Sequence, residues 1–153
     1  MKALTIWQPW ASLILHGFKP YEFRGWKVPK FVVGQRIAIH AGARKIPKKE
    51  WRAFKIGLAQ GSGPRQALNS GAKTWLEEFA GEQCQNLPHG AVLATAVIGP
   101  EVHPSLITID GKPIVNDSDR DDHFNWGWPL TEIEPVMPPV EVRGAQGFWN
   151  WRA

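Results

Sequence analysis

Apolar and polar positions alternate over several short stretches of the chain, and this period of two predicts β-strands. Residues 2–7 (KALTIW) alternate in this way. Residues 36–42 (RIAIHAG) turn Ile37 toward one face of a strand and Arg36 and His40 toward the other. The pattern therefore predicts a protein rich in short strands, with further extended segments at residues 19–26, 91–99, 127–134, 139–143 and 148–151.

Three other segments follow the helical period of 3.6. After Pro9, which suits a first helical turn, apolar residues recur at positions 10, 13 and 14, and Gly17 is a natural end for this helix. Residues 47–59 and 72–81 each carry an apolar or aromatic stripe at helical spacing. The polar, glycine-bearing residues 57–71 predict a loop between these two helices.

This order of elements predicts a single α+β domain over residues 1–153, built as a small, partly open β-barrel with flanking helices. Residues 104–123 are expected to be mostly loop, with a hairpin closed by Asp110 and Gly111. Regular strand–helix alternation is missing, and neither GxGxxG nor GxxxxGK[ST] occurs. Nucleotide cofactor binding through a phosphate loop is therefore disfavoured.

The composition is that of a globular protein, with 43% hydrophobic and 21% charged residues. The single cysteine, Cys84, excludes an internal disulfide, a multi-cysteine zinc site and an iron–sulfur cluster held by this chain alone. One thiol fits a reducing cytosol. No apolar run is long enough for a membrane span, and Gln8, Pro9 and Ser12 interrupt any signal-peptide core. We expect a cytoplasmic protein that does not enter a membrane.

The net charge of +4 conceals a strong asymmetry along the chain. Residues 1–65 contain 13 basic and 2 acidic side chains, whereas residues 66–153 contain 5 basic and 12 acidic ones. Two interpretations follow. The first half forms a basic face for a polyanion, or the two halves attract each other across one fold.

Three charged residues lie within an aromatic-rich segment near the N-terminus, in GFKPYEFRGW. Burying Lys19, Glu22 and Arg24 is costly unless they satisfy one another or a ligand. Glu22 and Arg24 share a strand face, where a positioned pair can form. An exposed strand with an incidental ion pair is the alternative, but Glu22 is one of only two acids in the first 65 residues.

The order of LTIWQPWASLI, GFKPYEFRGW, GQRIAIHAG, GAVLATAVI, WGWPL and GAQGFW resembles the ASCH domain, a relative of the PUA domains, over nearly the whole chain. Its most specific mark is G-x-K-x-x-E-x-R, here Gly17, Lys19, Glu22 and Arg24. The resemblance implies a PUA-like β-barrel with a cleft beside it that binds RNA or a nucleoside.

Some small members of that family resemble amidohydrolases of acylated cytidine nucleosides, which use a lysine, a nearby threonine and a distant glutamate. Others resemble metal-dependent ribonucleases acting on single-stranded RNA, with Mn²⁺ or Mg²⁺. Lys19 matches the lysine, whereas Glu22 stands where the threonine is expected. A carboxylate is a poorer acyl acceptor than a hydroxyl but still acts as a base. Lys19 and Glu22 are therefore the candidate catalytic residues, and apart from the ribonuclease metal no cofactor is indicated.

Further candidate binding residues surround this motif or follow it. The small residues after His40 leave room for a ligand to approach, and the cations near residue 50 suit phosphate contact. A solvated face is the alternative for those cations. The candidates for binding RNA or substrate are Gln8, Trp10, Arg24, Arg36, His40, Arg44, Lys45, Lys48, Lys49, Arg52 and Trp126.

The acidic run at residues 116–123 suggests a cation site at first sight. It fails the EF-hand pattern, because Asp122 and Trp128 stand where glycine and glutamate are required. A solvated acidic loop is favoured, and no metal ligand is assigned. The preferred function is binding of RNA or a modified nucleoside. The alternatives are a hydrolase that uses the same cleft and a protein-interaction module with a basic face.

Overall fold

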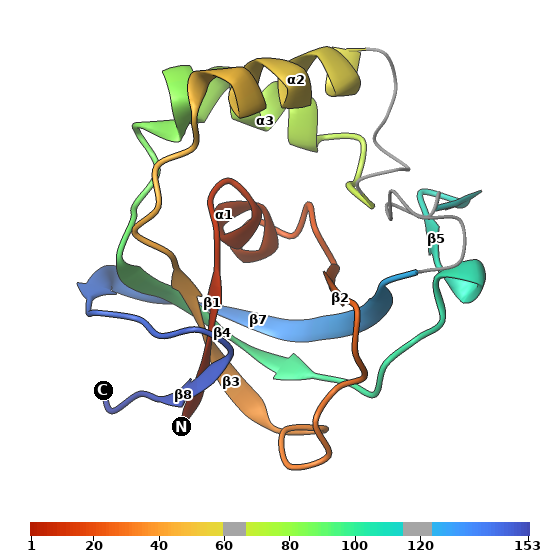
Figure 1. Ribbon diagram of the computed structural model, residues 1–153, viewed down its shortest axis with the longest axis vertical. Helices are drawn as coiled ribbons and strands as arrows, with labels where there is room; N and C mark the ends of the chain where they lie inside the picture. Colours follow the sequence, from red (N-terminus) through yellow and green to blue (C-terminus); the bar gives the residue numbers. More distant parts are fainter. Residues whose placement is uncertain (60–66, 115–123) are drawn as a thin grey trace.

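The computed structural model describes residues 1–59, 67–114 and 124–153. Its centre is a six-stranded mixed sheet in the order β2-β7-β4-β3-β1-β8, with a separate two-stranded hairpin (Figure 1). The sheet strands are β1 (Lys2–Ile6), β2 (Tyr21–Arg24), β3 (Arg36–Ala41), β4 (Ala91–Ile98), β7 (Trp126–Glu141) and β8 (Phe148–Asn150). β1 and β3 run parallel, and all the other neighbours in this sheet are antiparallel.

The sheet curls around one helix, which gives the α+β half-barrel that the sequence predicted. Helix α1 (Trp10–Leu15) lies against the concave face, where Ala11 and Ile14 pack into a core formed by every long strand (Figure 1). The helix ends two residues before Gly17, whose φ of +77° allows the chain to reverse. Trp128 is 1% exposed and completes this core beside α1.

A second apolar core covers the other side of α1. It is formed by α2 (Lys48–Ala59) and α3 (Ala72–Phe79), both of which the sequence predicted, with α1 contributing Leu13 (Figure 1). The 3₁₀ turn η1 (Glu82–Cys84) follows α3 and buries Cys84 in this core. Burial raises the pKa of the Cys84 thiol to about 12.

One strand prediction is wrong. The two strands expected at 127–134 and 139–143 form a single strand, β7. Its first four residues pair with β2, and from Leu130 onward the described strand partner is β4 alone. Pro135, Pro138 and Pro139 lie in this second part, where one edge of β7 faces no described strand and a missing N–H donor can be tolerated. The register with β4 is also irregular at two places along it.

The predicted hairpin at Asp110-Gly111 joins β5 (Thr108–Ile109) to β6 (Lys112–Pro113). The short 3₁₀ turn η2 (Pro104–Leu106), which precedes it, was not expected. The acidic run at 116–123 and residues 60–66 of the predicted loop at 57–71 lie outside the described residues.

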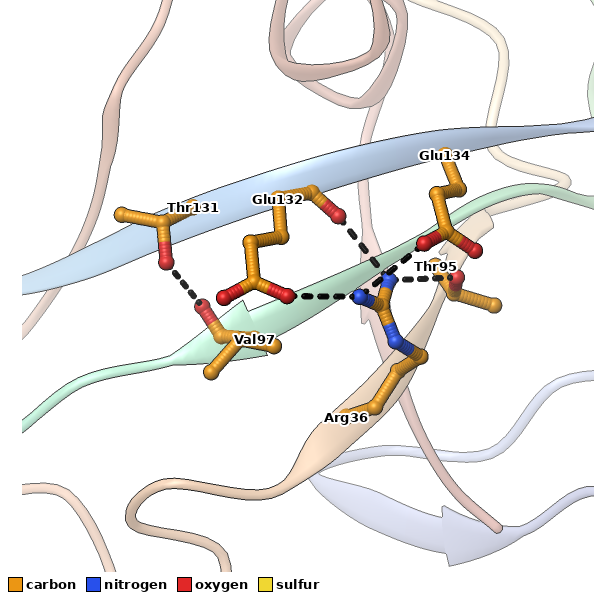
Figure 2. Close-up of polar contacts among 6 residues, drawn as sticks. All are labelled: Arg36, Thr95, Val97, Thr131, Glu132 and Glu134. Atoms are coloured by element: carbon orange, nitrogen blue, oxygen red, sulfur yellow. Dashed lines mark hydrogen bonds and ion pairs between the residues drawn. The ribbon is translucent and has the colours of Figure 1, made fainter.

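Arg36 connects three strands on the outer face of the sheet (Figure 2). Its Nη1 donates to Thr95 Oγ1 at 3.1 Å and to the Glu132 carbonyl oxygen at 2.9 Å. Its Nη2 lies 3.0 Å from a Glu132 carboxylate oxygen and 3.1 Å from one of Glu134. A cation of the first half of the chain is thus paired with two acids of the second half, as the second interpretation of the charge asymmetry expected.

Candidate functional site

A cleft of about 790 Å³, which we call the main cleft, brings several of the predicted residues together. Its walls come from the end of β1, the start of α1, β2, the end of β3 and the connection between β7 and β8 at residues 142–147. A smaller pocket of about 320 Å³ lies between α2 and α3 and is lined by none of the predicted site residues.

A buried carboxylate between two cations forms one wall. Glu22 is 7% exposed, with one oxygen 3.0 Å from Arg24 Nε and the other 3.7 Å from Lys19 Nζ. The Arg24 contact is an ion pair that is not aligned as a hydrogen bond. The predicted pairing of Glu22 with Arg24 on one strand face is confirmed. Two cations against one carboxylate leave this wall with an excess of one positive charge.

Lys19 lies behind Glu22 and does not line the main cleft. Its ammonium donates to the Tyr21 carbonyl oxygen at 2.6 Å. It also lies 5.0 Å from the ring centroid of Phe23 and 5.7 Å from that of Trp10. The aromatic faces and the Glu22 carboxylate together offset the cost of burying this cation.

Arg24 reaches from the same pair into the main cleft. Its Nη2 donates to the Thr5 carbonyl oxygen at 3.4 Å, a long contact that places the guanidinium at the end of β1. The guanidinium carries five N–H groups, so most of its donors remain able to meet a ligand. Arg24 is thus the group that presents the positive charge of this wall.

A chain of hydrogen bonds fixes the opposite wall. Trp149 Nε1 donates to Thr5 Oγ1 at 3.0 Å, Thr5 Oγ1 lies 3.1 Å from His40 Nδ1, and His40 Nε2 lies 3.0 Å from the Val142 carbonyl oxygen. A carbonyl oxygen only accepts, so Nε2 carries the proton and Nδ1 accepts from the Thr5 hydroxyl. A side chain at Gly144 would collide with the His40 ring, so this segment packs directly on the imidazole.

An exposed aromatic side chain stands at the rim. Trp7 lines the main cleft and is 54% exposed. The Arg44 guanidinium lies 4.3 Å from its ring centroid and is itself held by Glu50 at 2.6 Å. Gly42 lies against the indole, where a Cβ would come within 2.9 Å of Trp7. Trp7 is therefore oriented by its neighbours while much of its surface faces solvent.

The predicted residues divide into two groups. Trp10, Glu22, Arg24 and His40 line the main cleft, whereas the remaining candidates do not. Arg44 lies beside it on Trp7, and Lys45, Lys48, Lys49 and Arg52 are exposed on α2 and the segment before it.

Three other predicted residues have structural partners elsewhere. Arg36 is occupied on the outer face, and Gln8 is buried with its Nε2 bonded to Ser12 Oγ at 2.8 Å and to the Pro88 carbonyl oxygen at 2.6 Å. Trp126 is half-buried, and Lys27 Nζ lies 5.1 Å from its ring centroid.

Sequence reasoning missed Thr5, Trp7 and the segment 142–147 as cleft residues. The segment did carry a signal, since Gly144 and Gly147 bracket a stretch of small and polar residues before an aromatic strand. Thr5 carried no such signal, because the alternation along a strand shows which face a residue lies on but not whether that face lines a cleft. Among the described residues, no group of three or more His, Cys, Asp or Glu side chains is placed to hold a metal ion.

No protein-family model matches the chain, and no curated protein matches its sequence. Among solved structures, the fold is similar to that of ASCH from Zymomonas mobilis, with a TM-score of 0.53 and 14% sequence identity over 99% of this chain and 87% of that one. A mutant of the same protein, with one serine replaced by alanine, matches with the same values. The chain therefore has the ASCH fold, as its sequence resemblance predicted. Across the described residues, no helix is long and apolar enough to cross a membrane.

The His40 chain predicts a pH-dependent stability. Burial lowers the pKa of the His40 imidazole, opposed in part by the hydrogen bond to Val142. The unfolded chain then binds a proton more readily, so the stabilisation from neutral His40 is complete above about pH 6.5 and is lost as the pH falls through the folded pKa. We expect His40→Gln to lower the free energy of unfolding by about 1–3 kcal/mol at pH 7.5 and by less at pH 5.

Urea unfolding of both proteins between pH 5 and pH 8 measures this difference. His16→Gln is the comparison variant: burial also lowers the pKa of His16, so its removal should change the pH dependence in the same direction. Its ring packs on Trp75 outside the main cleft, so the loss at pH 7.5 should be smaller than for His40→Gln. Parallel pH profiles for the wild type and His40→Gln would contradict the assignment of the neutral imidazole.

Proposed function

We propose that the main cleft binds a nucleotide unit of RNA. The observation that carries this proposal is the excess positive charge on the Glu22 wall, presented to the cleft by Arg24. A guanidinium is the side chain best suited to a phosphate, because it offers paired N–H donors and stays charged. Glu22 holds the base of that guanidinium, so its orientation is set before a ligand arrives.

The other features of the main cleft suit the rest of a nucleotide. Its volume of about 790 Å³ is in the usual range for small-molecule sites. Trp7 offers an exposed indole at the rim, and aromatic side chains stack on unpaired bases in RNA-binding sites. The resemblance to the ASCH domain, which implies RNA or nucleoside binding, supports the same ligand class.

The basic residues of α2 extend this surface. Lys45, Lys48, Lys49 and Arg52 are exposed, and they follow directly after Ala43 and Arg44 at the edge of the main cleft. In this part of the chain Glu50 is the only acid, and it pairs with Arg44. We assign these cations to the phosphates of a strand whose nucleotide occupies the main cleft, in preference to an acidic protein partner.

Arg24→Gln tests the cleft. We expect a loss of ten- to hundredfold in affinity for short single-stranded RNA, because a charge-assisted hydrogen bond contributes about 1.5–3 kcal/mol. The measurement is fluorescence anisotropy of a labelled oligonucleotide at low salt. Arg36→Gln is a matched control, since the two arginine side chains are 27% and 28% exposed and Arg36 lies on the outer face. Equal losses in both variants would place the binding surface elsewhere.

Replacing Lys48, Lys49 and Arg52 by alanine tests the basic face. The affinity for single-stranded RNA should fall with salt, with each neutralised phosphate adding about 0.7 to the log–log slope. We expect the triple variant to flatten that slope while base preference stays the same. A slope equal to that of the wild type would show that these residues are only solvated.

A hydrolase remains the second candidate, because Glu22 is a buried carboxylate at the cleft with a lysine 3.7 Å away. In this alternative Glu22 acts as a base toward the ligand and Lys19 moves a proton behind it. The substrate is the amide of an acylated cytidine or a phosphodiester of single-stranded RNA. The described residues supply no metal cluster for the latter.

Lys19→Arg and Glu22→Gln distinguish the two candidates. Arginine stays protonated and glutamine cannot accept a proton, so in a catalytic site both variants should lose turnover. Both should retain most of the ligand affinity. A binding site should show no turnover even in the wild type. The assay is hydrolysis of both substrates with and without Mn²⁺ or Mg²⁺, with thermal unfolding of each variant as the control for folding. Turnover that survives both substitutions would remove this pair from catalysis.

A further inference from the structure

Two large aromatic side chains are exposed on the connection between β2 and β3, outside the main cleft. Trp26 is 56% exposed and Phe31 is 62% exposed. On the same connection Val28 and Val32 are buried in the core beneath the sheet. The segment thus has inner positions that anchor it and outer positions that direct aromatic rings to solvent. Exposed aromatic side chains that share one surface mark a candidate binding site.

The connection is held in place by hydrogen bonds along its length. Trp128 Nε1 donates to the Trp26 carbonyl oxygen at 3.0 Å, Val32 N donates to the Pro29 carbonyl oxygen at 3.0 Å, and Gly34 N donates to the Ile98 carbonyl oxygen at 2.7 Å. Because Trp128 is itself buried, the backbone of Trp26 is fixed to the core. The two exposed rings are therefore presented by an anchored backbone.

Cations lie between and beside these rings. Lys27 and Lys30 are exposed, and Lys2 Nζ lies 5.6 Å from the centroid of Phe31. The sequence has no acid between Glu22 and Glu50. An acid reaches this segment from elsewhere, since Glu101 lies 3.8 Å from Lys27 Nζ. The surface at residues 24–31 is thus both aromatic and predominantly basic, and we call it the aromatic strip.

The aromatic strip is continuous with the main cleft at two points. The Arg24 guanidinium, which lines the cleft, lies 5.8 Å from the ring centroid of Trp26. Phe31 packs edge-to-face on Phe148, with ring centroids 6.1 Å apart, and Phe148 directly follows the cleft residue Gly147. A polymer that leaves the main cleft past Arg24 meets Trp26 first.

We infer that the aromatic strip is a second subsite, where Trp26 and Phe31 stack the unpaired bases that adjoin the nucleotide in the main cleft. This inference rests on the proposed function and narrows its ligand to a single-stranded polynucleotide. Cations interspersed with aromatic rings are the elements of sequence-tolerant single-strand binding, in which cations track the backbone and rings stack on bases. Protein interfaces are instead depleted in lysine, which disfavours a protein partner here.

A length series tests the inference. Affinities for a mononucleotide and for single-stranded RNA of two to eight nucleotides are measured by calorimetry with the wild type and with Trp26→Ala/Phe31→Ala. We expect the wild type to bind the longer strands at least tenfold more tightly than the mononucleotide. At high salt, which suppresses the phosphate contacts of α2, the double variant should lose that gain and keep the mononucleotide affinity.

Phe79→Ala is the matched control, because Phe79 on α3 is 55% exposed and lies outside the aromatic strip; it should leave the length gain intact. Trp26→Leu/Phe31→Leu keeps apolar bulk without a ring, and it should lose the gain even if the alanine variant folds poorly.

The failures are distinguishable. A length gain retained in both double variants, or a mononucleotide affinity that falls in parallel, would overturn the aromatic strip and leave the cleft proposal standing. Absence of binding by the wild type at every length would overturn both. A concentration-dependent dimer that the double variants abolish, together with an unchanged length gain, would identify the strip as a contact between copies of the chain.

Discussion

The carboxylate of Glu22 is withdrawn from water, and this one constraint organises the site. A buried carboxylate requires cations close by, and removing either partner leaves a charge uncompensated. Lys19 fulfils this need from behind and Arg24 from the cleft side, so the polypeptide from residue 19 to 24 has little freedom. Because β2 pairs with β7 directly opposite, with Glu22 across from Trp128, the charged group is built into the sheet. The position of Arg24 in the main cleft is thus fixed by the buried Glu22 and by the pairing of β2 with β7.

The charge asymmetry of the sequence has two outcomes in the structure, in different places. On the outer face Arg36 meets Glu132 and Glu134, so part of the asymmetry is neutralised between the two halves of the chain. On α2 the cations stay exposed, and the nearby acid Glu50 is engaged by Arg44. The second interpretation therefore holds for Arg36, and the first stays a proposal for the exposed cations of α2. The difference arises because Arg36 is carried by the central strand β3, which pairs with β4 and is separated from β7 by β4 alone, whereas α2 lies apart from the sheet (Figure 1).

Periodicity predicted most of the elements, because apolar residues at period two or 3.6 have one way to reach a core. Periodicity failed at β7, because prolines normally end a strand. Only the positions of the partner strands β2 and β4 show that β7 tolerates its prolines. The charged motif was predictable because Glu22 is an acid in a basic, aromatic segment. The structural partners of Gln8 and Arg36 were not predictable, because a sequence shows the type of a residue but not what it contacts. In the hydrogen-bonded chain from Trp149 to Val142, the first and last links join residues more than one hundred positions apart. No local sequence pattern predicts such contacts.

The burial of Cys84 makes the molecule convenient for spectroscopic work. The thiol is fully enclosed by the second core, and burial raises its pKa to about 12, so the reactive thiolate is scarce at neutral pH. A maleimide or a spin label therefore has no competing target on the folded native chain. One cysteine introduced at any exposed position can be labelled selectively without first removing the natural one, which keeps the packing between α1, α2 and α3 intact.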